Sequence, residues 1–139
     1  MAPTSAGYSG TPLVKKLGIK PGSRIELWNE PDDYWELLGD LPSEARRADA
    51  DEVGVEFSHV FATTASELRA GLDAARSRMA RGGMVWLSWP KKSSGVETEL
   101  DGNVVRQLGL ETGLVDIKVC AVDDTWSGLK FVIRVADRA

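Results

Sequence analysis

The feature that most constrains the fold is residues 84–89, Met-Val-Trp-Leu-Ser-Trp, which are apolar at nearly every position and end at Pro90. A strand that alternates apolar and polar side chains can leave one face in water, but a strand that is apolar on both faces must be covered on both sides. Helices packed on the two faces of a mainly parallel sheet meet this requirement. The segment therefore predicts a central strand of an α/β domain.

The other segments alternate between strand and helix patterns, as a three-layer sandwich requires. Thr64 and Glu67 have the spacing of a capping box, and the apolar stripe after them predicts a helix that Gly82 and Gly83 end. The connection 123–128 is short and therefore predicts an antiparallel hairpin. The expected strands are residues 24–28, 55–62, 84–89, 115–122 and 129–135. The expected helices begin at Thr11, Pro31, Thr64 and near residue 99, and they end at Gly18, Gly39, Gly82 and Gly113.

The domain organisation follows from the segments that lack such patterns. Residues 1–10 are mainly small and are expected to form a flexible N-terminal arm. Residues 43–52 are charged and rich in alanine, so we expect a loop or weak helix where a core strand could have stood. Residues 11–139 are expected to form a single α/β domain, a three-layer sandwich whose mainly parallel sheet ends in a C-terminal antiparallel hairpin.

The composition of the chain indicates a globular protein and limits the kinds of partner that it can bind. The chain of 139 residues is 42% apolar and 27% charged, as globular proteins are, and no apolar run reaches the length of a membrane span. The net charge of −4 argues against nucleic acid or an anionic membrane as a partner. The start of the chain lacks a signal-peptide pattern and Cys120 is the only cysteine, so a cytoplasmic location is expected. A protein or an anionic small molecule is the expected partner, and the oligomeric state stays open.

The order of the expected elements resembles the class I methyltransferase fold. The resemblance rests on a helix, the turn Pro21-Gly22, a strand, then residues 81–83 (Arg-Gly-Gly) before an apolar strand, and a terminal hairpin. It implies a Rossmann-like domain in which the first strand runs into a glycine-rich loop that approaches the cofactor. This chain has Asn-Glu-Pro-Asp-Asp at residues 29–33 in that place. The second strand of the family, whose end presents an acid to the cofactor ribose, would fall within residues 43–52, so no cofactor is expected.

A second resemblance is to a family of small bacterial proteins of unknown function. It implies a bacterial origin but no reaction, because the family has no established chemistry. The four matching segments span nearly the whole chain and are residues 8–13 (YSGTPL), 15–20 (KKLGIK), 88–92 (SWPKK) and 126–130 (WSGLK).

Polar and aromatic residues follow the expected parallel strands at their carboxyl ends, which share one edge of such a sheet and usually carry the binding site. If the penultimate strand is parallel to the others, the tip of the hairpin lies at this edge too. Lysine attracts phosphate or carboxylate and tryptophan offers a flat apolar surface, so the group suits an anionic or aromatic ligand. The candidate ligand- or partner-binding residues are Asn29, Glu30, Thr63, Lys91, Lys92, Ser93, Asp123, Trp126 and Ser127.

A structural interpretation of these residues stays open. Lys91 and Lys92 would then form a solvated loop, Asp123 and Asp124 would form the turn, and Trp126 would cover the core.

The five tryptophans divide between two expected roles. Trp89 and Trp126 flank the candidate edge and could stack on a ligand or partner. We expect Trp126 to be partly exposed beside Pro90 and Trp89, so that Trp126→Ala costs about 1 kcal/mol or less in stability. The remaining tryptophans are expected in the core and are Trp28, Trp35 and Trp86.

No complete catalytic or metal-binding set is present in the sequence. His59, the only histidine, has apolar neighbours and is interpreted as a structural, hydrogen-bonded residue. Cys120 has no histidine in register to activate it, and Ser88 and Ser127 lack the elbow of a catalytic serine. One histidine and one cysteine exclude the usual zinc site. The acids after the first strand match no calcium loop and are expected to cap the helix at Tyr34 instead; they are Glu30, Asp32 and Asp33.

These observations predict a non-catalytic binding or regulatory module on a degenerate methyltransferase-like fold. The alternative is an enzyme that acts on an anionic small molecule bound at the carboxyl edge of the sheet. A nucleic-acid role is disfavoured, because the chain is acidic and carries no stacking motif of a known module.

Overall fold

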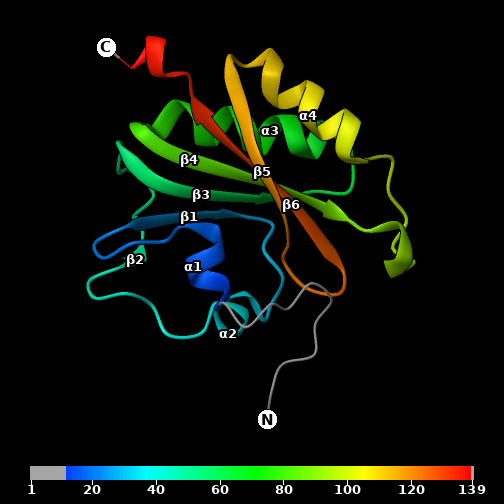
Figure 1. Ribbon diagram of the computed structural model, residues 1–139, viewed down its shortest axis with the longest axis horizontal. Helices are drawn as coiled ribbons and strands as arrows, with labels where there is room; N and C mark the ends of the chain where they lie inside the picture. The colour runs from blue at the N-terminus through cyan, green and yellow to red at the C-terminus, as the bar shows by residue number, and fades with distance from the viewer. Residues whose placement is uncertain (1–11, 139) are drawn as a thin grey trace.

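The computed structural model describes residues 12–138, which form one mixed sheet of six strands with helices on both faces (Figure 1). The expected cap at Thr11 and the expected arm lie outside the described residues. The strands are β1 (Arg24–Trp28), β2 (Arg46–Arg47), β3 (Val55–Phe61), β4 (Met79–Pro90), β5 (Leu114–Ala121) and β6 (Trp126–Ile133). The α-helices are α1 (Leu13–Leu17), α2 (Tyr34–Leu38), α3 (Ala65–Arg78) and α4 (Gly102–Glu111), and short 3-10 turns cover Lys92–Ser94 and Val135–Asp137.

The strand order β2-β1-β3-β4-β6-β5 confirms the predicted α/β fold with a C-terminal hairpin. β2, β1, β3 and β4 are parallel, whereas β6 is antiparallel to both β4 and β5. The hairpin therefore places its second strand inside the sheet and its first strand at the edge. No helix among residues 12–138 is both long and apolar enough to cross a membrane.

The region from residue 43 to 52 contains the two-residue strand β2, which pairs with the start of β1. Arg46 and Arg47 are both exposed, so this strand contributes nothing to the apolar core. The expected loop or weak helix is therefore only partly right, because most of the region is loop but a short parallel strand pairs with β1.

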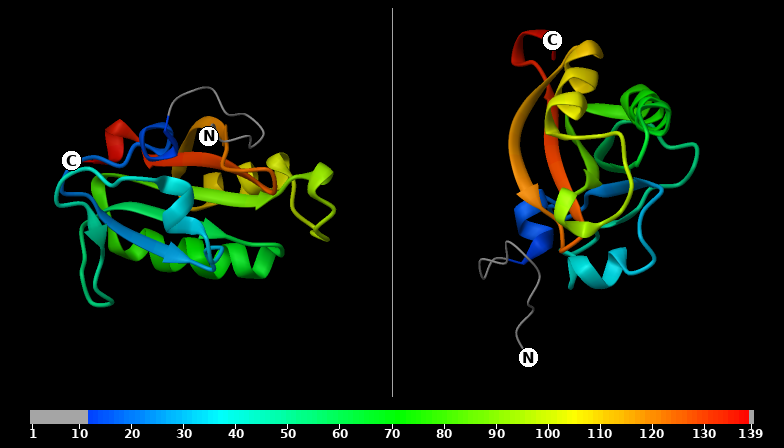
Figure 2. Two further views of the ribbon diagram at one scale, coloured as in Figure 1. Left: turned by 90° about the horizontal axis from the view of Figure 1, so that it is seen from below. Right: turned by 90° about the vertical axis from the view of Figure 1, so that its right-hand side faces the viewer.

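Two apolar layers lie on opposite faces of the sheet. α3 and α4 cover one face, and α1 and α2 cover the other (Figure 2). β3 alternates between them, because Phe57 and Phe61 pack toward α1 and α2 while Val60 packs toward α3. β4 is buried on both faces, with Trp86 in one layer and Leu87 in the other. This confirms the prediction that residues 84–89 form a central strand.

The boundary between α3 and β4 differs from the expectation. The helix ends at Arg78, and β4 begins at Met79 rather than after Gly83. Gly83 serves close packing instead, because a Cβ there would lie 2.9 Å from the carbonyl oxygen of Val55 and 3.1 Å from that of Glu56. The pairing of β3 with β4 is irregular at this point. Gly83 therefore marks a close approach of two strands, and neither glycine of the pair is a helix stop.

β5 is an edge strand with an interrupted register. Its pairing with β6 shifts between Asp116 and Lys118, which places Ile117 in a bulge. Ile117 is 53% exposed and Val119 is 65% exposed, so the outer part of this strand lies in water.

Gly109→Ala tests how tightly α4 packs on β6. A Cβ at Gly109 would overlap the ring of Phe131, which is fully buried and cannot move aside. Alanine favours a helix over glycine by about 1 kcal/mol, but the overlap outweighs this, so the free energy of unfolding should fall by about 2 kcal/mol. Urea denaturation measures the change. Gly82→Ala is the control, since a Cβ there has no atom within 4 Å; equal stabilities of the two variants would contradict the close packing.

Candidate functional site

The carboxyl ends of β1, β3 and β4 lie at one edge of the sheet because these strands are parallel (Figure 1). Asn29 follows β1, and its side-chain amide donates to the carbonyl oxygen of Phe61 at 3.3 Å. This bond joins the ends of β1 and β3. Asn29 is exposed and has a positive φ of 58°, so it also makes the turn out of β1.

The tip of the hairpin lies at the same edge. Pro90 at the end of β4 is the register partner of Trp126 at the start of β6. The backbone amide of Lys91 donates to the carbonyl oxygen of Thr125 at 2.7 Å. The structure therefore brings the turn of the hairpin beside the start of the lysine pair.

The lysine pair leads into the 3-10 turn Lys92–Ser94. Lys92 and Ser93 are exposed and Lys91 is half-buried. Neither lysine forms an ion pair with any residue from 12 to 138. Their ammonium groups are therefore available to an anion at this edge.

Thr63 connects the end of β3 to the segment before α4. Its amide and hydroxyl donate to Oε1 of Glu67 at 3.0 and 3.1 Å, and these bonds lower the pKa of that carboxyl. The carbonyl oxygen of Thr63 accepts the hydroxyl of Thr98 at 2.6 Å. Thr64 caps α3 through its hydroxyl, which accepts the Glu67 amide at 3.2 Å, as the capping box predicts. The polar groups of Thr63 are thus used within the fold.

Glu30 turns toward β2 rather than toward the lysine pair. Its Oε2 accepts from Nη1 of Arg47 at 3.1 Å. Asp33 is the residue before α2, but its side chain makes no capping hydrogen bond, so the expected cap at Tyr34 is wrong. The amide of Tyr34 instead donates to the carbonyl oxygen of Pro31 at 3.0 Å.

Asp123 holds the turn of the hairpin. Its Oδ1 accepts the backbone amides of Thr125 at 2.8 Å and Trp126 at 2.7 Å. β6 already begins at Trp126, so the connection is shorter than the expected 123–128 segment. The half-buried Ser127 is a strand residue opposite Trp89. For Asp123 these contacts match the structural interpretation of the turn.

Trp126 is half-buried and covers the α1–α2 layer. Its ring meets Phe61 edge to face, with centroids 5.0 Å apart. Trp89 lies in the layer on the opposite face of the sheet and is only 8% exposed. The expected packing of Trp126 beside Trp89 is therefore wrong, although its neighbour Pro90 is as expected.

The other tryptophans partly follow the prediction. Trp86 is fully buried, and its indole nitrogen donates to the carbonyl oxygen of Leu17 at 2.8 Å. Trp28 is half-buried against the α3–α4 layer. Trp35 is 36% exposed, because α2 has barely more than one turn and turns this side chain away from the sheet. Trp35 is thus not the core residue that we expected, and the buried Trp89 is not a stacking surface.

His59 lies at the centre of a buried polar chain. One ring nitrogen contacts the Tyr34 hydroxyl at 2.8 Å and the other contacts the Ser88 hydroxyl at 2.7 Å. The ring stacks on Phe61 at 4.2 Å. His59 is fully buried, and burial lowers its pKa to about 3, so it stays neutral at ordinary pH. The prediction of a structural, hydrogen-bonded histidine is confirmed.

Neither Cys120 nor Ser88 is placed to act as a nucleophile. Cys120 is 8% exposed, its thiol contacts the carbonyl oxygen of Ala121, and burial raises its pKa. Ser88 is fully buried and holds His59. No group of three or more His, Cys, Asp or Glu side chains within residues 12–138 is placed to hold a metal ion.

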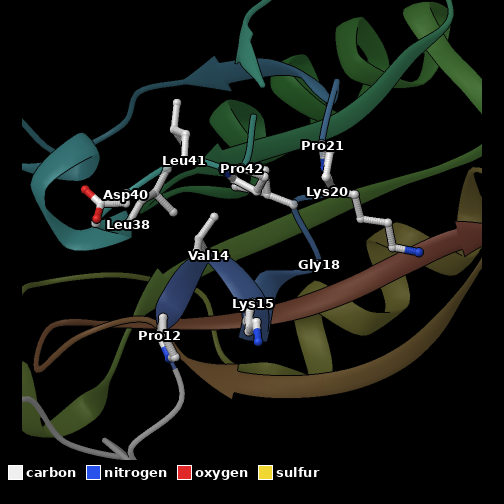
Figure 3. Close-up of a pocket in the computed structure, with 12 residues that line it drawn as sticks. Pro12, Val14, Lys15, Gly18, Lys20, Pro21, Leu38, Asp40, Leu41 and Pro42 are labelled. Carbon is white, nitrogen blue, oxygen red and sulfur yellow. The ribbon is translucent and has the colours of Figure 1, made fainter. Parts of the chain in front are cut away.

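A cavity of about 700 Å³ lies away from the carboxyl edge, between α1 and the chain that leaves α2 (Figure 3). We call it the α1–α2 groove. Its wall is mainly apolar, and Figure 3 places Lys15 and Lys20 on the side of β6 and Asp40 on the far side of Leu38. Sequence reasoning missed this groove, because it is formed by residues 12–21 and 38–42, which are not adjacent in the chain. The cluster of lysines at 15–20 was the available signal.

Comparisons with solved structures agree on the fold. The chain is similar to a SAM-dependent methyltransferase from Aquifex aeolicus, with 10% identity, a TM-score of 0.61 and coverage of 88% of each chain. It is similar to a putative type 11 methyltransferase from Sulfolobus solfataricus, with 10% identity, a TM-score of 0.62 and coverage of 90% of this chain and 91% of that one. Aeropyrum pernix fibrillarin, solved with bound S-adenosyl-L-methionine, gives 15% identity, a TM-score of 0.62 and coverage of 84% and 69%.

At such identities the likeness concerns the fold alone, which is the Rossmann-like α/β fold of these methyltransferases. A scan against protein-family models finds no match to this chain, and a search of curated proteins finds none either.

Trp126→Ala measures how much this side chain covers the core. Because the indole packs edge to face on Phe61, we now expect the free energy of unfolding to fall by about 2 kcal/mol. Trp35→Ala is the matched control and should cost about 1 kcal/mol or less, since Trp35 is more exposed. Urea denaturation measures the free energy of unfolding of both variants. If Trp126→Ala lowers it no more than Trp35→Ala does, Trp126 does not cover the core and is a contact residue as first expected.

His59 should make stability depend on pH in a defined window. The unfolded imidazole takes up a proton below about pH 6.5, whereas the folded one stays neutral down to about pH 3. The unfolded state therefore binds more protons in between, so stability is highest above pH 6.5 and falls as the pH falls, approaching about 1.4 kcal/mol per pH unit. Since His59 is the only histidine and carboxyls titrate lower, urea denaturation between pH 7 and pH 5 reports on it.

The comparison protein is His59→Gln. It should be less stable at pH 7, because it disturbs the contacts to Tyr34 and Ser88, but its stability should hardly change down to pH 5. An equal fall in both proteins would exclude His59 as the cause.

Proposed function

We propose that this chain is a non-catalytic binding or regulatory module built on a methyltransferase-like fold. The observation that supports it most directly is the segment after β1, where the resemblance implies a glycine-rich cofactor loop. Asn29 is bonded to Phe61 and Glu30 to Arg47, so the polar groups of this segment hold β1 to β3 and to β2. The side chains of Asn29 and Glu30 and the ring of Pro31 also occupy space that glycines would leave to a ligand.

The reactive residue types support the same proposal. The one histidine and the one cysteine are buried, and each has a pKa shifted by burial toward its neutral form. A general base or a nucleophile must reach its substrate. His59 and Ser88 are fully buried, and the two ring nitrogens of His59 are bonded to the hydroxyls of Tyr34 and Ser88, which suits a structural role.

The proposed setting is the bacterial cytoplasm, with a protein or an anionic small molecule as partner. The net charge of −4 disfavours nucleic acid and anionic membranes. The lysine pair that follows β4, with Lys92 exposed and Lys91 half-buried, supports an anionic contact, since neither ammonium group is paired with a carboxylate of residues 12–138.

That lysine pair also favours the second candidate, an enzyme acting on an anionic small molecule at the carboxyl edge. A thermal-shift screen over nucleotides and phosphorylated metabolites separates the two proposals. A hit that is lost in the Lys91→Ala, Lys92→Ala double variant and is turned over by the native chain would favour the enzyme. A hit without turnover would favour the binding module.

Calorimetry with S-adenosylmethionine tests the missing cofactor site. We expect no binding heat up to about 1 mM ligand, because residues 29–33 fill the place of the cofactor loop. Thermal unfolding checks the result independently, since a ligand at a hundredfold its dissociation constant adds about 2.7 kcal/mol. Micromolar binding that disappears in Asn29→Ala, Glu30→Ala would contradict the proposal.

A further inference from the structure

The α1–α2 groove combines an apolar wall with two lysines, Lys15 and Lys20, on the side of β6 (Figure 3). Val14, Ile19 and Leu38 of its lining are buried, and Leu41 and Pro42 are half-buried. A volume of about 700 Å³ lies within the range of sites for small ligands. The groove is therefore large enough for a molecule with an apolar body.

The lysine end of the groove extends onto β6 and β5. Lys130 is the direct register partner of Lys118 across the two strands. Its ammonium group lies beside Gly18, a residue of the groove, at 3.6 Å from the position of an added Cβ. Partial burial and the neighbouring Lys118 and Lys20 lower the pKa of Lys130. Lys20 and Lys118 thus both repel the ammonium group of Lys130.

This arrangement lacks a counter-charge. Lys20, Lys118 and Lys130 form no ion pair with any carboxylate of residues 12–138. Like charges directly opposite each other on neighbouring strands destabilise a sheet. The chain has a net charge of −4, yet three lysines lie beside an apolar groove. The repulsion at Lys130 is unfavourable, and a bound anion would remove it.

We propose that the α1–α2 groove binds an apolar carboxylic acid. The carboxylate lies between Lys20 of the lining and Lys130, whose ammonium group is beside Gly18. The apolar body runs along Val14, Leu38 and Leu41 toward Asp40. The cationic end consists of lysines, and no arginine among residues 12–138 lines the groove. α1 also ends at Gly18, and the C-terminal end of a helix carries a partial negative charge. These features suit one negative charge better than the two of a phosphate monoester. The proposal does not depend on the proposed function, because the groove is separate from the carboxyl edge.

Calorimetric titration of the full chain tests the proposal, with decanoate and decyl phosphate below their micellar concentrations and decanol below its solubility limit. We expect saturable one-to-one binding of decanoate that weakens as the salt concentration rises. Decanol should bind at least about tenfold more weakly than decanoate, and decyl phosphate should also bind more weakly than decanoate. Decanol binding as tightly as decanoate would overturn the role of the lysines. Tighter binding of decyl phosphate would overturn the assignment of a carboxylate, and no binding of decanoate would overturn the site.

Variants locate the two ends of the ligand. Lys20→Gln with Lys130→Gln should weaken decanoate at least about tenfold, whereas Lys92→Gln at the carboxyl edge is the matched control and should bind as the native chain does. Leu41→Asp should weaken decanoate by a similar factor, because it puts a negative charge beside the apolar body. Thermal unfolding verifies the fold, and the double lysine variant should melt at or above the native temperature, since it removes repulsion. Unchanged affinity in either groove variant would refute the site.

Discussion

From Val85 to Pro90, strand β4 has no face in water, and this constraint decides where the helices and the hairpin lie. Val85 and Leu87 pack on the side of α3 and α4, whereas Trp86 packs on the side of α1 and is held there by its hydrogen bond to Leu17. β3 pairs with one edge of this strand and β6 with the other, so its backbone groups are satisfied as well. The buried polar residue Ser88 near its carboxyl end is accommodated because His59 supplies a partner.

The sheet is held differently at its β2 side. There β2 is two residues long and exposed, so it makes few apolar contacts. Ion pairs connect this part of the sheet instead: Arg24 pairs with Glu52 and Glu56, and Arg46 also pairs with Glu52. These bonds lower the pKa of Glu52 to about 2. Exposed ion pairs contribute little stability each. We therefore expect β2 to separate from β1 at a lower free energy than the buried strands β1, β3 and β4 separate from one another.

Local signals in the sequence predicted most of the fold. The continuous apolar pattern of β4, the capping residue Thr64 and the alternation in β3 each depend on neighbours in the chain, so their elements were found. The exposure of Trp35 and the burial of Trp89 depend on how the short helix α2 and the 3-10 turn pack in the folded chain. The spacing of apolar residues in the sequence does not contain this information. At the candidate edge, strand directions placed Asn29, Lys91 and Asp123 correctly, but the contacts that engage Glu30 and Asp123 arise from tertiary packing. The groove escaped prediction for the same reason.

The bulge in β5 has a consequence for how copies of this chain behave together. A strand with one free side is a template for another strand, and here it carries the exposed apolar side chains Ile117 and Val119. The bulge interrupts the regular spacing of amides and carbonyls along this side, and Lys118 stands between the two apolar residues. An incoming strand would meet mismatched hydrogen-bonding groups and a charge at the same point. The chain thereby limits sheet growth from copy to copy, which protects it from aggregation at high concentration.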